Sequence, residues 1–94
     1  MAKKHRTKRK TGKTFFYDVT VDLHGMTLEE AIRKMDSYIY SGEYNTILVV
    51  HGIGKGILRR GLRQYFKENS YVKESLPGES LNLPGAEGIT VIYL

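Results

Sequence analysis

Alternation of apolar and polar residues over residues 17–23 predicts the first β-strand of the chain. Within this stretch Val19, Val21 and Leu23 fall on one face, as expected for a half-buried strand. Residues 46–50 form an unbroken run of β-branched residues and leucine, which predicts a second strand that is buried on both faces, as in a parallel sheet. Two further short strands are predicted at residues 72–76 and 89–94.

Two helices are predicted between these strands. Thr27 and Glu30 form a capping box, in which each side chain accepts a hydrogen bond from the backbone N–H of the other residue. The helix that begins there ends at Ser41-Gly42, and its apolar positions recur at helical spacing: Leu28, Ala31, Ile32, Met35 and Ile39. A second helix follows residues 51–56 and ends at Asn69-Ser70. Its inward positions are predicted to be Ile57, Leu58, Leu62, Tyr65 and Phe66.

The predicted order of elements is βαβαββ, which indicates an α/β chain folded as an α+β two-layer sandwich. Parallel strands that are joined through a helix form a right-handed crossover, so we expect both helices on one face of a small mixed sheet. A chain of 94 residues makes one small domain. We assign this domain to residues 15–94 and expect a disordered basic arm over residues 1–14. These patterns do not give the order of the strands in the sheet.

Composition and charge narrow the classes of function. The chain has no cysteine, which excludes disulfides, thiolate zinc sites and cysteine nucleophiles and fits a cytoplasmic location. No apolar run approaches the roughly 20 residues of a membrane-spanning helix, so we expect no membrane partner. Residues 1–13 carry seven cations and no acid, whereas the rest of the chain has a net charge of −2. Such an arm is typical of tails that contact nucleic-acid phosphates, although a purely solubilising tail has the same composition.

Both predicted strand–helix junctions contain a histidine followed by a glycine. His24-Gly25 follows the first strand, and His51-Gly52 follows the second strand 27 residues later. The carboxyl ends of parallel strands lie at one edge of a sheet, where open α/β folds bind their ligands. We therefore expect the two histidines to converge at this edge.

The second junction, His-Gly-Ile-Gly-Lys-Gly at residues 51–56, predicts a phosphate site. Glycines let backbone N–H groups turn toward an anion, and the N-terminus of the following helix contributes about half a positive charge. The spacing fits neither a nucleotide P-loop nor a dinucleotide fingerprint, so the expected ligand is a phosphate of RNA or DNA. A tight turn that packs the helix against the sheet is the alternative explanation for the same glycines. The expected phosphate-binding residues are Gly52, Gly54, Lys55, Gly56, Arg59 and Arg60.

Three motifs together resemble the small MutS-related (Smr) domain. They are Asp-Leu-His-Gly at residues 22–25, His-Gly-x-Gly-x-Gly at residues 51–56, and Gly-x-Thr-Val-x-Tyr-Leu at residues 88–94. The resemblance covers about residues 19–94. It implies a sandwich similar to the C-terminal domain of translation initiation factor 3, and nucleic-acid binding with nicking of DNA or cleavage of RNA, in some members at stalled ribosomes. Where the family often has Gly-Gly-x-Gly, this chain has Gly-Ala-Glu-Gly at residues 85–88, which places an anion near the expected phosphate path.

The resemblance implies catalytic roles for Asp22, His24 and His51. In RNA cleavage one histidine would take the proton of the 2′-OH, while the other histidine or a water would protonate the leaving oxygen. Asp22 lies two residues before His24 on the same side of the strand and would orient its imidazole. The three side chains could also hold one divalent ion, but the carboxylate cluster of a two-metal nuclease is missing, so we expect no required metal or other cofactor.

Two functions stay open from the sequence. The first is an endonuclease that acts on RNA or DNA, and the second is a non-catalytic module that binds nucleic acid or the ribosome. The endonuclease needs His24 and His51 exposed at the edge that holds Lys55, whereas binding needs only the cations. A structure in which either histidine is buried and fully hydrogen-bonded would favour the binding module. The sequence does not indicate an oligomeric state.

Overall fold

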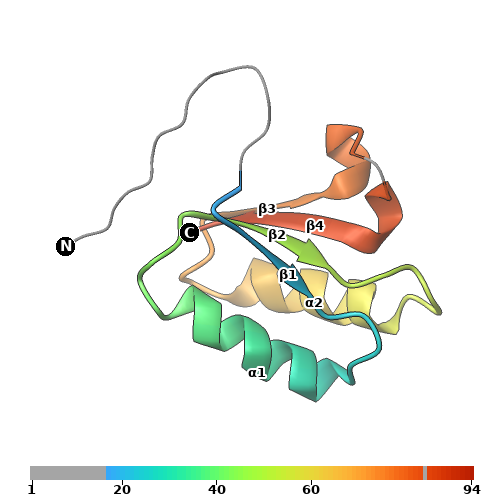
Figure 1. Cartoon of the computed structure of the whole chain (residues 1–94), viewed down its shortest axis with the longest axis horizontal. Helices are drawn as coiled ribbons and strands as arrows, with labels where there is room; N and C mark the ends of the chain where they lie inside the picture. Colours follow the sequence, from blue (N-terminus) through green and yellow to red (C-terminus); the bar gives the residue numbers. More distant parts are fainter. Residues whose placement is uncertain (1–16, 84) are drawn as a thin grey trace.

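The computed structural model describes residues 17–83 and 85–94, and the predicted basic arm lies outside the described residues (Figure 1). Within them the elements follow the predicted βαβαββ order. They are β1 (Val19–Asp22), α1 (Leu28–Ile39), β2 (Thr46–Val50), α2 (Ile57–Glu68), β3 (Glu74–Pro77) and β4 (Ile89–Tyr93), with short 3-10 turns at Gly78–Leu81 and Ala86–Gly88. No helix in the described part of the chain is long and apolar enough to cross a bilayer.

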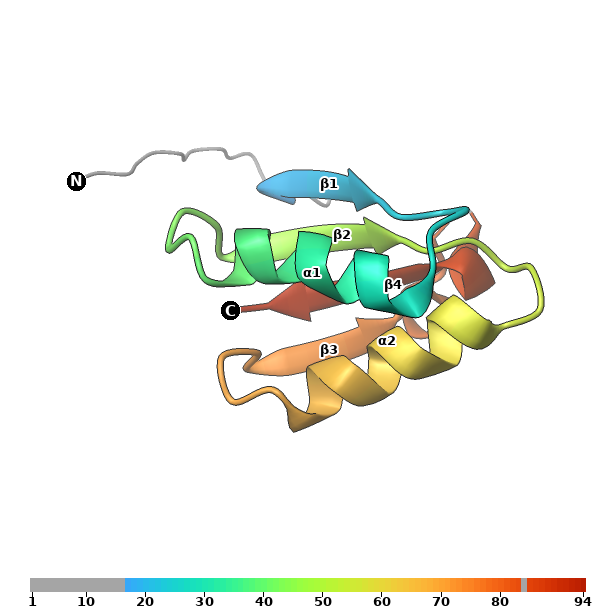
Figure 2. The ribbon, with the colours of Figure 1, turned by 90° about the horizontal axis from the view of Figure 1, so that it is seen from below.

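The strands form one mixed sheet in the order β1-β2-β4-β3. β1 and β2 are parallel, whereas β4 is antiparallel to both of its neighbours. Both helices cover the same face of this sheet, as Figures 1 and 2 show, so the predicted two-layer sandwich is confirmed. The carboxyl ends of β1 and β2 and the N-terminal ends of both helices lie at one end of the molecule (Figure 2).

The hydrophobic core lies between the sheet and the two helices. Leu58, Leu62 and Phe66 lie four residues apart on one face of α2 and pack into this core. Ile57 falls outside that face and is 58% exposed, so its predicted inward position is wrong. The buried core residues are Val21, Leu23, Ala31, Met35, Ile39, Ile47, Val49, Leu62, Phe66 and Ile92.

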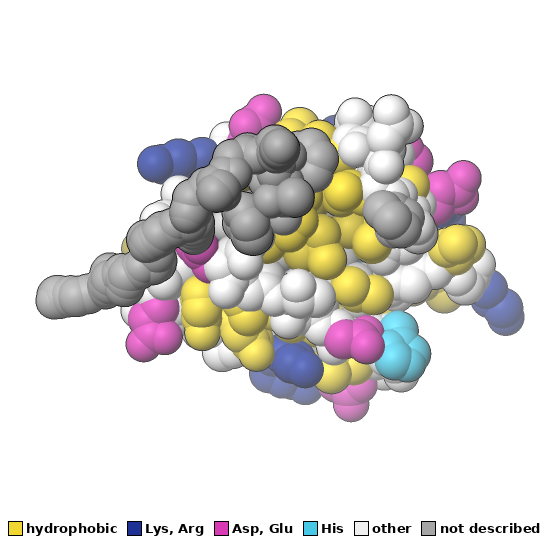
Figure 3. Space-filling view, turned by 45° about the horizontal axis from the view of Figure 1, so that its top comes forward, with side chains coloured by type: hydrophobic (Ala, Val, Ile, Leu, Met, Phe, Trp, Pro, Cys, Tyr) yellow, Lys and Arg dark blue, Asp and Glu magenta, His cyan; other side chains and the backbone are white. Residues whose placement is uncertain are grey.

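The prediction that the strand over residues 46–50 is buried on both faces is also wrong. In β2 the side chains of Ile47 and Val49 face the helices and are fully buried, whereas Leu48 and Val50 on the other face are only half-buried. The strand is therefore not buried on both faces, because both crossover helices pack on the same side of the sheet. Hydrophobic side chains gather over this opposite face (Figure 3).

The third strand begins later than its sequence pattern predicts. The backbone N–H of Val72 donates to the carbonyl of Asn69 at 3.0 Å in the turn that ends α2. Val72 therefore lies in the turn that reverses the chain direction, and β3 begins at Glu74.

The predicted capping box is present at the start of α1. The Thr27 hydroxyl accepts from the Glu30 N–H at 3.2 Å, and the Glu30 carboxylate accepts from the Thr27 N–H at 3.0 Å. Replacing Thr27 with alanine removes the first of these bonds and is expected to lower the free energy of unfolding by about 1 kcal/mol. Urea denaturation followed by circular dichroism measures this change. Thr27→Ser keeps the hydroxyl and should stay close to wild type, so an equal loss in both variants would contradict the capping role.

Candidate functional site

Two loops meet at the carboxyl ends of the parallel strands. One joins β1 to α1 and contains His24, and the other joins β2 to α2 and contains residues 51–56. The Cβ atom of His24 lies 3.5 Å from the position that a Cβ on Gly52 would occupy, so the two loops lie next to each other at this edge of the sheet. A shallow pocket of about 280 Å³ lies along the second loop and is also lined by Gly25 and Met26 of the first.

His24 and Asp22 form an exposed hydrogen-bonded pair in the first loop. The Nδ1 atom of His24 lies 2.6 Å from Oδ1 of Asp22, and the same oxygen accepts from the backbone N–H of His24 at 3.1 Å. The two side chains are 73% and 55% exposed. These hydrogen bonds from His24 hold the pKa of the Asp22 carboxyl below its usual range. Because an ionised carboxylate only accepts, Nδ1 carries the proton and Nε2 is the nitrogen that can act on a substrate.

His51, in contrast, is buried and only 3% exposed. Its Nδ1 lies 3.1 Å from the carbonyl oxygen of Gly52, and its Nε2 lies 2.9 Å from Oγ1 of Thr90. Nε of Arg63 donates to the same Thr90 oxygen at 2.8 Å. The Gly52 carbonyl can only accept, so Nδ1 of His51 carries a proton and donates it to that oxygen. Burial lowers the pKa of His51 and favours the neutral imidazole, whose Nε2 accepts the proton of the Thr90 hydroxyl, while the Thr90 oxygen accepts from Nε of Arg63.

The structure thus gives different environments to the three residues for which the resemblance implies catalytic roles. Asp22 and His24 form a pair, whereas both ring nitrogens of His51 are occupied inside the fold. Within residues 17–83 and 85–94, no three histidine, aspartate or glutamate side chains are placed to share a metal ion. The geometry does not favour a divalent ion held jointly by Asp22, His24 and His51.

Arg63 and Thr90 belong to this site although sequence reasoning did not select them. Arg63 also donates to the Ile89 carbonyl at 2.9 Å and to the Glu79 carboxylate at 2.8 Å. The hydrogen bond from Arg63 lowers the pKa of Glu79. Arg63 and Thr90 are 27 residues apart in the sequence, and only packing of α2 on β4 brings them together. The sequence signal that could have pointed to Thr90 is a polar residue at an inward position of an otherwise apolar strand.

The turn that precedes β4 is hydrogen-bonded to the glycine-rich loop. The carbonyl of Gly88 accepts from the backbone N–H groups of both His51 and Gly52, at 2.9 and 3.0 Å. A Cβ on Gly88 would lie 3.2 Å from backbone atoms of Gly52, so a side chain there would push the loop away. In the same turn Glu87 lies 3.4 Å from Arg59, one of the residues expected to bind phosphate.

The two helices begin in different ways. α1 has the Thr27 capping box, whereas α2 begins after Gly56 in a left-handed conformation with φ of 83° and no side-chain cap. Guanidinium nitrogens of Arg59 and Arg60 lie within 3.1 Å of the position of a Cβ on Gly56. Uncapped N–H groups, the helix dipole and nearby cations make such an end suited to an anion. The sequence-predicted phosphate residues are all in this loop and the first turn of α2: Gly52, Gly54, Lys55, Gly56, Arg59 and Arg60.

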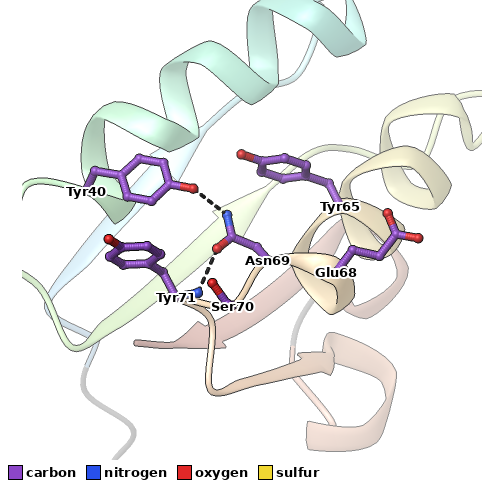
Figure 4. Close-up of a pocket in the computed structure, with 6 residues that line it drawn as sticks. All are labelled: Tyr40, Tyr65, Glu68, Asn69, Ser70 and Tyr71. Atoms are coloured by element: carbon purple, nitrogen blue, oxygen red, sulfur yellow. Dashed lines mark hydrogen bonds between the residues drawn. The ribbon is translucent and has the colours of Figure 1, made fainter.

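A second pocket lies where α1 and α2 end, at the opposite end of the helices (Figure 4). It has a volume of about 390 Å³ and is lined by Tyr40, Tyr65, Glu68, Asn69, Ser70 and Tyr71. The Asn69 amide donates to the Tyr40 hydroxyl at 3.0 Å, and the rings of Tyr40 and Tyr71 meet edge to face with centroids 4.7 Å apart. None of the sequence-predicted site residues lines this pocket, so it is separate from the candidate site.

Comparison with known proteins identifies the class of domain to which this fold and its two histidine–glycine loops belong. The Smr domain family matches residues 21–94, and the chain belongs to this family. Endonuclease MutS2 of Lactobacillus johnsonii is 39% identical over 77 residues, which cover 79% of this chain and 10% of that protein. Endonuclease MutS2 of Clostridium botulinum is 40% identical over 78 residues, with 80% and 10% coverage. The chain thus spans about a tenth of the length of these relatives.

The structural comparison agrees with this assignment. The crystal structure of the Smr domain of Thermus thermophilus MutS2 matches with a TM-score of 0.68 and 29% sequence identity. The match covers 80% of this chain and 95% of that domain. The similarity therefore concerns the Smr domain, and not the remainder of the MutS2 proteins.

The buried position of His51 predicts an acid-sensitive site. Burial lowers the pKa of its imidazole below the ordinary value of about 6.5. Between the folded and unfolded pKa values the unfolded chain binds more protons, so stability should fall as the pH drops below about 6.5. An NMR titration of the ring nitrogens should show the neutral Nδ1–H form of His51 at pH 6.5. Titration of His51 at or above this pH, or a neutral Nε2–H form, would contradict the assignment.

The Thr90 hydroxyl offers a second test of the same network. Thr90→Val keeps the shape but leaves Nε of Arg63 and Nε2 of His51 without this partner. We expect the free energy of unfolding to fall by about 1–3 kcal/mol, the cost of an unsatisfied buried polar group, as measured by urea denaturation. Thr90→Ser retains the hydroxyl and serves as the matched control. If valine and serine are equally stable, the hydroxyl does not hold the two side chains.

Proposed function

We propose that this chain binds the phosphate backbone of RNA or DNA at the glycine-rich loop and cleaves a phosphodiester bond at the Asp22–His24 pair. The observation that carries the proposal is the uncapped N-terminus of α2, where cationic side chains gather directly beside the loop of His24. The name endonuclease, given to the MutS2 relatives, supports the same class of substrate.

Binding follows from the electrostatics of the loop. The first N–H groups of α2 have no side-chain cap, and the dipole of the helix places positive potential at the same point. The exposed Lys55 and Arg60 add full charges, and the guanidinium group of Arg59 adds one that Glu87 partly balances. Gly52 lines the same pocket as Gly56, and a Cβ on Gly52 would lie 3.5 Å from the Cβ of His24.

Cleavage follows from the exposed pair. Asp22 holds Nδ1–H of His24, so Nε2 takes a proton from the 2′-OH of RNA or from a water that attacks DNA. The attacking oxygen bonds to phosphorus, the bond from phosphorus to the leaving oxygen breaks, and water protonates that oxygen. Lys55 and the loop N–H groups stabilise the extra negative charge on the phosphorus centre. His51 positions the loop from within the fold and exchanges no proton with the substrate.

Burial of His51 favours a second candidate, a non-catalytic module that binds nucleic acid or the ribosome. Both of its nitrogens are hydrogen-bonded, so a mechanism that needs two exposed histidines is not available. The binding module uses the same loop and the same cations, and it differs only in the absence of turnover. The cytoplasmic location stays a prediction in both cases.

Replacing His24 with alanine distinguishes the two functions. We expect wild type to cleave end-labelled single-stranded RNA or branched DNA, and His24→Ala to be slower by about 10²–10⁴-fold because the general base is lost. Fluorescence anisotropy should show that this variant still binds the same substrate. His5→Ala is the matched control, since His5 lies in the sequence outside the predicted domain, and it should cleave like wild type.

Each reaction is run with and without EDTA and at several salt concentrations. Salt-sensitive binding without cleavage in any lane would establish the binding module and reject the enzyme. Cleavage that EDTA abolishes would reject the metal-independent role of His24. Binding that does not change with salt would contradict both functions, because contacts to phosphates release counterions.

A further inference from the structure

The cations of the glycine-rich loop and α2 fall into two groups, and the first group is engaged within the protein. Arg59 lies 3.4 Å from Glu87, and Arg63 lies 2.8 Å from Glu79. Their side chains are only 26% and 22% exposed. These two arginines therefore connect α2 to the turns that precede β4, and their charges are largely balanced.

The second group faces solvent. Lys55, Arg60 and Lys67 are exposed, and none of them forms an ion pair with an acid in residues 17–83 or 85–94. Arg60 and Lys67 are seven residues apart, which places them two helical turns apart on one face, about 10 Å along the axis. Lys55 precedes them in the loop at the N-terminal end of the same helix.

A groove of about 310 Å³ runs along this face of α2. Its lining consists of Arg59, Arg60, Arg63, Gln64 and Lys67, and it contains no acidic residue. Guanidinium nitrogens of two arginines also approach one point above Gly56, although Glu87 is the only carboxylate that pairs with either of them in the described residues. Like charges held this close together are stabilised by an anion between them. A helix face that contacts only water would not need two guanidinium groups to lie this close together.

We propose that a nucleic-acid backbone runs from the glycine-rich loop along this face of α2, with Arg60 and Lys67 contacting successive phosphates. Arg59 and Arg63 also hold the loops through Glu87 and Glu79, so the contacts along α2 beyond the loop come from the exposed cations. This inference rests on the proposed function and extends its interface by the length of α2. It adds Lys67, which lies far from the phosphate loop in the sequence, to the binding residues.

The test measures how binding depends on salt. Anisotropy of a fluorescein-labelled oligouridylate is recorded over a series of salt concentrations for wild type, Lys67→Ala and Lys55→Ala. Loss of one phosphate contact should weaken binding several-fold and reduce the slope of log K against log salt by about 0.7 for a single strand. Lys67→Glu should weaken binding further, since it places an anion in the groove.

Arg33→Ala is the matched control. Arg33 is an exposed cation on α1 without an ion pair in the described residues, so its removal changes the net charge by the same amount. We expect its affinity and slope to equal those of wild type. An equal effect of Arg33→Ala and Lys67→Ala would show a response to net charge alone and would overturn the extended interface.

The outcomes for Lys55 separate this inference from the proposed function. If Lys55→Ala weakens binding while Lys67→Ala does not, the phosphate loop stands and the path along α2 is wrong. If wild type shows no salt-dependent binding, the proposed function itself fails. Circular dichroism of each variant checks that the fold is retained, which is expected because all substituted side chains are exposed.

Discussion

The buried hydroxyl of Thr90 is the group on which the arrangement of the candidate site depends. It accepts a hydrogen bond from Arg63 of α2 and donates one to His51 at the start of the glycine-rich loop. A central strand, a helix and a loop thus share one polar contact inside the core. Because each unsatisfied buried group would cost about 1–3 kcal/mol, the three elements are held in one relative position. The first N–H groups of α2, which have no side-chain cap, remain available to a ligand.

The two histidine–glycine pairs have similar sequence contexts and opposite surroundings. His24 follows β1, which pairs only with β2 among the strands of residues 17–83 and 85–94, and its side chain is exposed. His51 follows β2, which lies between β1 and β4, and its ring therefore meets Thr90. An exposed imidazole with one nitrogen free is suited to proton transfer, whereas a buried one with both nitrogens engaged is suited to holding a loop. The position of each strand in the sheet thus decides the role of each histidine.

The cationic side chains of α2, like the two histidines, differ in their surroundings. Arg59 and Arg63 are the arginines that reach the acidic side chains of the turns before β4. Arg60 and Lys67 are exposed and form no ion pair with an acid in residues 17–83 or 85–94. One helix therefore fixes the geometry of the loop through its two paired arginines and presents its other cations to solvent. The uncapped N-terminus of the same helix joins this surface to the glycine-rich loop, whereas the tyrosine-lined pocket lies beyond its other end.

The sequence by itself determined the local elements of this protein. The capping box of Thr27, the helical spacing of Met35 and Ile39, and the alternation in β1 depend on neighbouring residues, and each is present as predicted. The family motifs are also local, and so is the pairing of Asp22 with His24, because the two residues are only two positions apart where β1 ends.

The tertiary structure alone decided the insertion of β4 between β2 and β3, which depends on how the sheet is assembled and not on any local period. That insertion brings Thr90 and Gly88 against His51. It buries His51 with both ring nitrogens hydrogen-bonded, and it brings Arg63 to Thr90 across 27 residues of sequence. Burial and hydrogen bonding of a side chain depend on contacts distant in the chain, and for this reason the sequence could indicate both histidines but could not distinguish their roles.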